Sequence, residues 1–194
     1  MEMAKLRKIN AVLGLLSAAA LLAHVGYTVY AYLAFYYNPA LKLWTAIPFI
    51  VLACLHAICA MAALFLQTDG MSLPLYSKQN RGTVLQRLSA ALILPLLILH
   101  LNTFDLLRAG AEAGRWFCFA LLMVSQPLFY AAVLTHVVPS LSKALITLGW
   151  LSSRETKRKL DRALYILGAA VFAAAAIAVC RTELLMFLSG GGAA

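Results

Sequence analysis

Four histidines are the residues of this sequence most able to do chemistry. Each stands inside a different long apolar segment, and they are all the histidines of the chain: His24, His56, His100 and His136. A neutral imidazole in an apolar surrounding needs a partner, and haem iron commonly supplies one as an axial bond. Taken singly, each could be a hydrogen-bonded interior residue, but ionisable residues in membrane spans usually mark functional paths. Four imidazoles would make two axial pairs.

The segments that carry these histidines are long enough to cross a membrane. Hydrophobic residues make up 63% of the 194 and charged residues 12%, and the mean hydropathy is +0.87. Five uncharged stretches meet or nearly meet the roughly 20 residues that a membrane span needs: 9–41, 43–68, 88–104, 116–142 and 163–180. We predict an all-α membrane protein with one domain over 1–194, a five-helix bundle with helices near 9–35, 42–67, 83–108, 115–150 and 160–188. The first stretch is too long for a cleaved secretory signal.

The basic residues predict how the helices are oriented. They gather at the N-terminus and in the connections 69–87 and 143–162, whereas the alternate sides hold only Lys42, Arg108, Arg115 and Arg181. By the positive-inside rule, the N-terminus is expected in the cytoplasm and the C-terminus outside, as for a multi-pass protein of a bacterial inner membrane. The net charge of +9 therefore indicates topology and not binding to nucleic acid. The polar connection 69–87 is a candidate docking surface on the cytoplasmic face.

Position along the helices predicts which histidines pair. Counted from the cytoplasmic edge, His24 and His100 lie beyond the middle of their segments, at about 24 and 20 Å for a rise of 1.5 Å per residue. His56 and His136 lie on the cytoplasmic side of the middle. We therefore expect His24 to pair with His100 nearer the outside, and His56 to pair with His136 nearer the cytoplasm.

Two basic residues near these pairs are candidates to neutralise haem propionates. Lys143 shares a helix face with His136 at an offset of seven residues, and Arg87 stands at the cytoplasmic start of the third helix. Arg87 could equally be a topology charge that reaches to the membrane surface. The four cysteines form no Cys-x-x-Cys-His motif, which excludes covalent attachment of a c-type haem.

Over about residues 5–185 the chain resembles the membrane cytochrome b subunit of the dihaem succinate dehydrogenase and fumarate reductase family. The likeness lies in one histidine on each of the first four helices and in two segments, QRLSAALILPLLILHL at 86–101 and THVVPSLSKALITLGW at 135–150. It implies two haem b groups: one near the cytoplasmic subunits on His56 and His136, and one on His24 and His100.

The resemblance also implies partners and a direction for electrons. Relatives anchor a flavoprotein with covalent FAD and an iron–sulfur protein on the cytoplasmic face, and exchange electrons with menaquinone. Such an anchor contributes haem and quinone sites, and the flavin chemistry takes place on its partner. Some relatives carry a glutamate near the histidine of helix 4, where this chain has Leu134 and Thr135. Asp105, near Asn102, is the best remaining acid for protonating a quinone, although it could be a solvated helix-end carboxylate.

Two other functions are compatible with the pattern. The chain could be the cytochrome b of another membrane reductase, of the hydrogenase or formate dehydrogenase type, although those usually place two histidines on one helix. It could also be a haem-free transport or assembly protein in which histidines bond neighbouring helices together. Such a protein should carry more acids within its spans than this sequence does.

Overall fold

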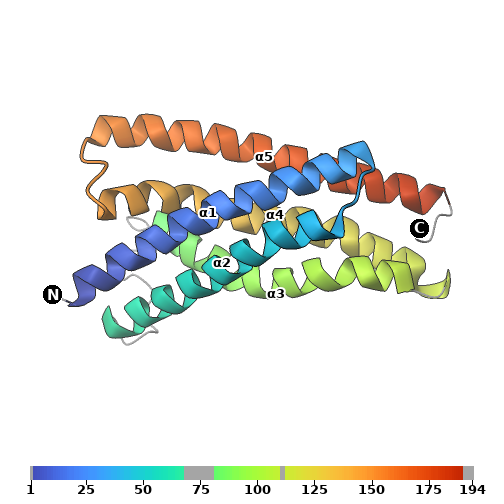
Figure 1. Cartoon of the computed structure of the whole chain (residues 1–194), viewed down its shortest axis with the longest axis horizontal. Coiled ribbons are helices and arrows are strands. Elements are labelled where there is room, and N and C mark those ends of the chain that lie inside the picture. The colour runs from blue at the N-terminus through green and yellow to red at the C-terminus, as the bar shows by residue number, and fades with distance from the viewer. Residues whose placement is uncertain (1, 68–80, 110–111, 190–194) are drawn as a thin grey trace.

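A computed structural model describes residues 2–67, 81–109 and 112–189, and in them the chain forms five long helices and no strand (Figure 1). The helices are α1 (Glu2–Ala34), α2 (Pro39–Gln67), α3 (Arg81–Ala109), α4 (Glu112–Thr147) and α5 (Arg154–Leu188). Each is long and apolar enough to span a membrane, so the predicted all-α fold with five candidate membrane spans is confirmed. Residues 68–80 of the candidate docking connection lie outside the described part of the chain.

All five helices begin earlier than the hydropathy pattern predicts, three of them by two or three residues and two of them, α1 and α5, by six or seven. Helix α1 starts at Glu2 and not near residue 9, and α5 starts at Arg154 and not near residue 160. The added residues are mostly charged, and Lys, Arg and Glu are good helix formers, so the helices continue beyond the apolar spans. At α5 the side chain of Ser153 accepts a hydrogen bond from the Thr156 N–H at 3.4 Å, which caps the helix.

Asn38 and Pro39 start α2 together. The Asn38 side-chain oxygen accepts the N–H groups of Ala40 at 3.0 Å and Leu41 at 3.2 Å, and proline at the first helical position has no N–H left to satisfy. The Tyr27 hydroxyl donates to the Asn38 carbonyl at 2.8 Å. These bonds fix the angle between α1 and α2, the helices that carry His24 and His56.

Helix α4 is continuous through Pro127 and Pro139 and ends at Thr147, three residues before the expected end at 150. Gly149 has φ +79°, which only glycine adopts without strain. Its N–H bonds the Ile146 carbonyl at 3.0 Å, and the Trp150 N–H bonds the Leu145 carbonyl at 2.9 Å. This is the usual left-handed helix end, and it stops α4 before Trp150.

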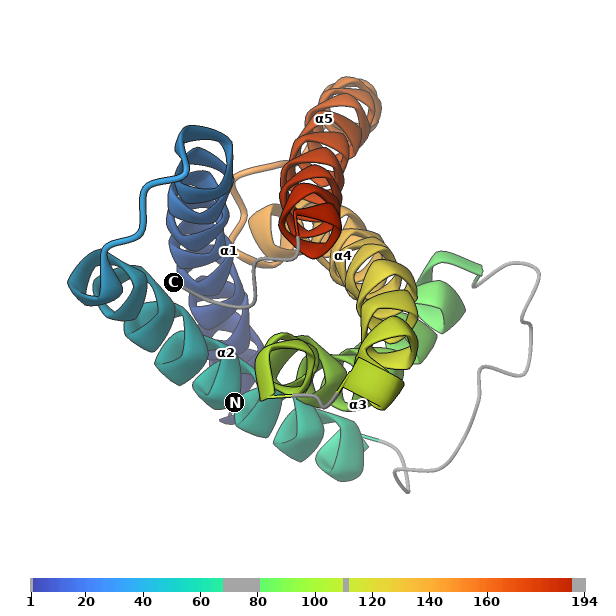
Figure 2. The same cartoon turned by 90° about the vertical axis from the view of Figure 1, so that its right-hand side faces the viewer.

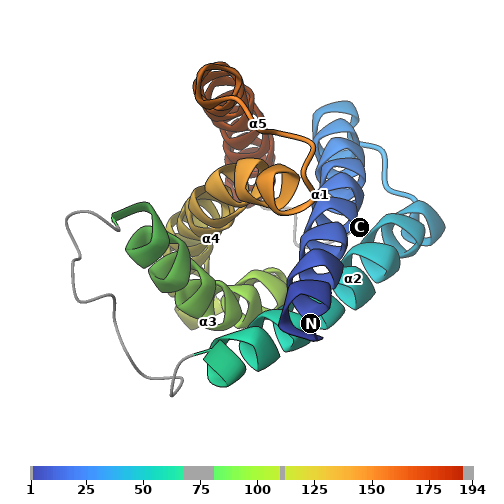
Figure 3. The same ribbon diagram turned by 90° about the vertical axis from the view of Figure 1, so that its left-hand side faces the viewer.

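The helices pack as two hairpins, α1 with α2 and α3 with α4, joined where α1 meets α4 (Figure 2). Helix α5 lies on the outside against α4 and α1, as the view from the other end also shows (Figure 3). Within the described residues, no Cα atom of α2 comes within 8 Å of α3 or α4, although packed helix axes are typically 8–10 Å apart. The two hairpins are therefore held apart where α2 faces the α3–α4 pair.

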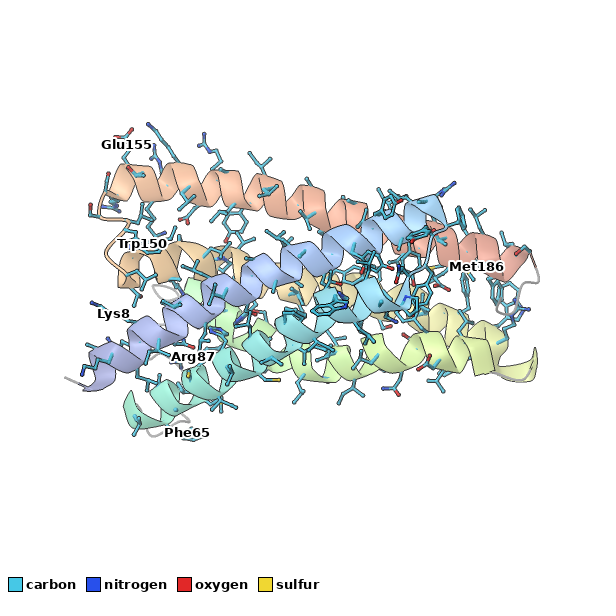
Figure 4. The ribbon with its side chains drawn as sticks, in the orientation of Figure 1. Lys8, Phe65, Arg87, Trp150, Glu155 and Met186 are labelled. Atoms are coloured by element: carbon cyan, nitrogen blue, oxygen red, sulfur yellow. The ribbon has the colours of Figure 1, made fainter. Side chains whose placement is uncertain are left out.

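The bundle has two ends of different character. The basic end carries Lys8, Arg87, Trp150 and Glu155, and the opposite end carries Met186 and the turn between α1 and α2 (Figure 4).

Candidate metal centres

His56 of α2 and His136 of α4 meet between the two hairpins. Their ring centroids are 6.4 Å apart and the ring planes are inclined at 65°. A metal–imidazole bond is about 2 Å long and a ring centre lies about 1 Å behind its nitrogen, so two rings on opposite sides of one metal have centres about 6 Å apart. The observed separation suits one metal ion held between these rings.

The hydrogen bonds of His56 and His136 leave the metal-binding nitrogen of each ring free. Nδ1 of His56 lies 3.1 Å from the Asn10 carbonyl, and Nδ1 of His136 lies 3.1 Å from the Gln86 carbonyl. A carbonyl can only accept, so Nδ1 carries a proton in both rings, and in the neutral imidazole Nε2 is then the nitrogen with the lone pair. Metal-ligating histidines almost always make this bond on the far side of the ring.

His100 is also protonated at Nδ1, as the hydrogen bonds through Gln126 and Thr103 indicate. Its Nδ1 lies 2.6 Å from Oε1 of Gln126, a residue with no exposed surface. The Gln126 amide donates to the Thr103 hydroxyl at 2.9 Å, and that hydroxyl donates to the Leu99 carbonyl at 2.8 Å. Because each donor in the chain is assigned, the Gln126 oxygen must face the ring and accept from His100.

His24 also makes its hydrogen bond through Nδ1, but over a longer distance. Its Nδ1 lies 3.4 Å from the Thr45 hydroxyl, which donates to the Leu41 carbonyl at 2.9 Å and therefore accepts from the ring. In the described part of the chain, the hydrogen bonds of all four histidines are made through Nδ1. In their neutral form all four rings thus present an Nε2 lone pair, the atom through which a metal could bind each of them.

The four histidines lie at two levels along the bundle. On α1, a Cβ added at Gly14 would lie 3.1 Å from Cε1 of His56, and His24 follows ten residues later. On α4, Gln126 at the His100 ring precedes His136 by ten residues. At 1.5 Å per residue both helices separate the levels by about 15 Å.

The level of His24 and His100 lies nearer the opposite end, and the two rings there interact electrostatically. Each stacks on a phenylalanine: His24 on Phe49 with centroids 6.2 Å apart, and His100 on Phe129 with centroids 4.7 Å apart. These aromatic faces give the level an apolar lining that suits a flat apolar ligand.

Positively charged side chains lie near the level of His56 and His136. The Lys143 ammonium donates to Oε1 of Gln86 at 2.5 Å and lies 3.5 Å from the Thr83 hydroxyl. Gln86 in turn donates to the Ser140 hydroxyl at 2.6 Å. Arg87, half-buried at the start of α3, acts electrostatically on Lys143, as does Lys157. Cations held at the basic-end side of His136 could neutralise carboxylates of a bound ligand.

The two residues expected at a quinone site both lie on α3. Asn102 and Asp105 are on the exposed face of α3, and the Asn102 amide donates to the Ile98 carbonyl of its own helix at 2.7 Å. The buried polar residue of this segment is Thr103. The structure does not bring Asn102 and the histidine partners together, and a quinone role for Asn102 and Asp105 stays a prediction.

Gln126 and Thr45 position histidines, and sequence reasoning did not identify them. Gln126 did offer a signal, because an amide in the middle of an apolar span requires a partner. Within the described residues, no three His, Cys, Asp or Glu side chains gather closely enough to hold a metal. At each level the chain therefore offers two imidazoles, and a bound metal would take its other ligands from a non-protein group.

Fold and site together describe a bundle of five helices that could each span a membrane, with the rings of His56 and His136 side by side between its two hairpins. Comparison of the chain with family models, curated proteins and solved structures finds no match.

Proposed function

We propose that this chain is a dihaem cytochrome b, the membrane anchor of a complex of the succinate dehydrogenase and fumarate reductase type. The observation that carries the proposal is the separation of the His56 and His136 rings, 6.4 Å, together with free Nε2 atoms on all four histidines. Bis-imidazole haem iron takes up and gives back single electrons, so haems at two levels about 15 Å apart would carry electrons across the bilayer.

Each group of residues has a defined part in this function. His56 and His136 hold one haem, and His24 and His100 hold the other. Lys143 and Arg87 neutralise propionates of the first haem, whose level faces the basic end. The basic end receives the iron–sulfur protein and the FAD-bearing flavoprotein, and menaquinone exchanges electrons in the membrane. The charge distribution supports a cytoplasmic N-terminus in a bacterial inner membrane.

Haem content tests the proposal most directly. The chain, purified from membranes supplied with ample haem, should show a b-type reduced-minus-oxidised spectrum and two haems per polypeptide. A colourless, folded protein would overturn the proposal and leave a haem-free transport or assembly protein.

Single substitutions test the ligand pairs. His136→Ala should remove one haem and leave the other, and His100→Ala should remove the haem that His136→Ala leaves. Asn102→Ala, on the exposed face of α3, is the matched control and should keep both. Retention of two haems in either histidine variant would contradict the pairing.

The partners require a separate experiment. Purification of the tagged chain in mild detergent should recover a flavoprotein with covalently bound flavin, which fluoresces on a denaturing gel. Recovery of a nickel- or molybdenum-containing partner instead would retain the haem assignment and replace the succinate dehydrogenase assignment by another membrane reductase.

A further inference from the structure

The first turns of α5 carry more positive charge than their own acids can pair. Residues 154–162 include five basic residues and two acidic ones. Each acid is paired with a lysine four positions away: Glu155 with Lys159 at 2.8 Å, and Asp161 with Lys157 at 2.5 Å. The other three basic residues are arginines with no carboxylate partner in the described part of the chain: Arg154, Arg158 and Arg162.

These three arginines lie on one face of α5 and are called the arginine stripe below. They are spaced four residues apart. Because an α-helix turns about 100° and rises 1.5 Å per residue, each arginine is turned about 40° from the previous one and lies about 6 Å further along the axis. All three are exposed. The stripe is therefore a continuous positively charged surface about 12 Å long.

The arginine stripe lies beside the contact between α5 and α4 and is not part of it. Gly168 marks that contact, since a Cβ added there would lie 2.5 Å from the Leu134 side chain and 2.9 Å from the Val138 side chain. Gly168 follows Arg158 by ten residues, which turns it about 80° around the helix from the stripe. Helix α5 is also on the outside of the bundle (Figures 2 and 3). The stripe is therefore accessible from the surroundings of the bundle.

An exposed apolar surface continues the arginine stripe along α5. Tyr165 follows Arg158 by seven positions, on the same face, and is 56% exposed, while the next residue, Ile166, is 66% exposed. Trp150, which precedes α5 at the basic end (Figure 4), is 72% exposed. Tyrosine and tryptophan are enriched where the hydrocarbon of a bilayer meets its headgroups. Because α5 is long and apolar enough to span a membrane, this order places the arginines among headgroups and the apolar side chains against acyl chains.

We propose that the arginine stripe binds the headgroups of anionic phospholipids in the leaflet at the basic end. A guanidinium can hold two oxygens of one phosphate with parallel hydrogen bonds, and basic clusters at the end of a membrane helix attract anionic lipid. An acidic protein would match the charge of the stripe but not the exposed apolar surface that continues it, whereas a phospholipid matches both. The inference goes beyond the proposed function, since it requires helices that span a membrane but no haem.

A fluorescent reporter directly beneath the arginine stripe tests the proposal on the full chain. Tyr165→Trp places a tryptophan there, in a background in which Trp44→Phe, Trp116→Phe and Trp150→Phe remove the three tryptophans of the sequence. The protein is reconstituted in phosphatidylcholine vesicles that contain increasing fractions of a lipid with brominated acyl chains, which quench a neighbouring tryptophan. Brominated phosphatidylglycerol should quench at lower fractions than brominated phosphatidylcholine.

Removal of the arginine charges should abolish this preference. One basic residue near the membrane surface contributes about a fivefold preference for anionic lipid, so the relative affinity for phosphatidylglycerol should fall about fivefold or more when the stripe is replaced: Arg154→Gln, Arg158→Gln and Arg162→Gln together. The matched control removes the same number of charges from exposed residues of α1 at the same end of the bundle, and should keep the preference: Lys5→Gln, Arg7→Gln and Lys8→Gln together. Equal loss in both variants would overturn the proposal.

The lipid that co-purifies with the chain provides a second readout without a reporter. In mild detergent, the unmodified protein should retain anionic phospholipid in excess over its share of the source membrane, and the variant without the arginine stripe should not. Equal quenching by the two brominated lipids would overturn this inference. Failure of that variant to recover the flavoprotein, with an unchanged lipid preference, would also overturn it and assign the stripe to a protein partner. A haem-free protein that keeps the preference would overturn the proposed function alone.

Discussion

At the scale of single residues, the four imidazoles have different partners but the same proton position. A backbone carbonyl, an amide oxygen or a hydroxyl accepts from Nδ1 in each case. The acceptor of His100 is the most firmly held, since Gln126 is fully buried and its amide is bonded to Thr103. Replacing a partner of this kind typically weakens metal binding 10- to 100-fold.

Gln126→Leu should therefore weaken haem binding at the His24 and His100 level by about 10- to 100-fold and leave the other level unchanged. Without its acceptor, His100 loses the bond that fixes its orientation. The measurement is haem per chain during titration of haem into the apoprotein in detergent. Ser125→Ala, at a buried neighbouring position, is the control. Equal loss at both levels would show that Gln126 supports the whole bundle and not one ligand.

Sequence reasoning found the histidines because a titratable residue in an apolar run is conspicuous. It could not find the burial of Glu183, which is 6% exposed but stands two residues from Arg181 and near the end of an apolar run, and there resembles a solvated helix end. Its burial depends on Tyr32, which is 151 positions away in the chain. In the same way, the exposure of Asp105 could not be read from the sequence of one helix alone.

At the scale of helices, Gly14 allows α1 to lie close to the ring of His56. A Cβ at Gly14 would lie 3.1 Å from Cε1 and 3.3 Å from Nδ1 of His56, whereas a Cβ at Gly26 of the same helix would meet nothing within 4 Å. The number of helices and their apolar spans were predictable from hydropathy, but this contact was not. It depends on how α1 and α2 cross, which the bonds around Asn38 help to set.

Gly14→Val should displace the His56 ring and remove the haem at the His56 and His136 level, and Gly14→Ala should weaken that haem to a smaller extent. The added atoms would overlap an imidazole held by the Asn10 carbonyl, and overpacking of this kind typically costs 1–3 kcal/mol. Haem content and the split of the two redox components measure the effect. Gly26→Val, in open space, should retain both haems, and loss of haem in that variant would point to a general defect of α1.

At the scale of the whole molecule, both proposed haems would connect the same two units. One ligand of each pair comes from the α1–α2 hairpin and the other from the α3–α4 hairpin, and α2 makes no close backbone approach to α3 or α4 in the described residues. The protein itself joins the hairpins through α1 with α4 and through α5. A bridging ligand would add a connection on the side of α2.

Haem binding should therefore raise the thermal unfolding midpoint, and each haem should contribute. A ligand present at 100 times its Kd adds about 2.7 kcal/mol to the folded state. Unfolding in detergent, followed by circular dichroism, should rank the haem-free protein below the single-haem His100→Ala and His136→Ala variants, and these below the protein with two haems. Equal midpoints would contradict the bridging arrangement.

The uniform proton position on the imidazoles has one more consequence. A ring that already offers a bare lone pair gives up no hydrogen ion when iron occupies it. At a pH at which the imidazoles are neutral, binding of haem to the apoprotein in weak buffer should therefore leave the pH of the medium unchanged. If the imidazoles had to lose a proton to bind the iron, the pH of the medium would fall.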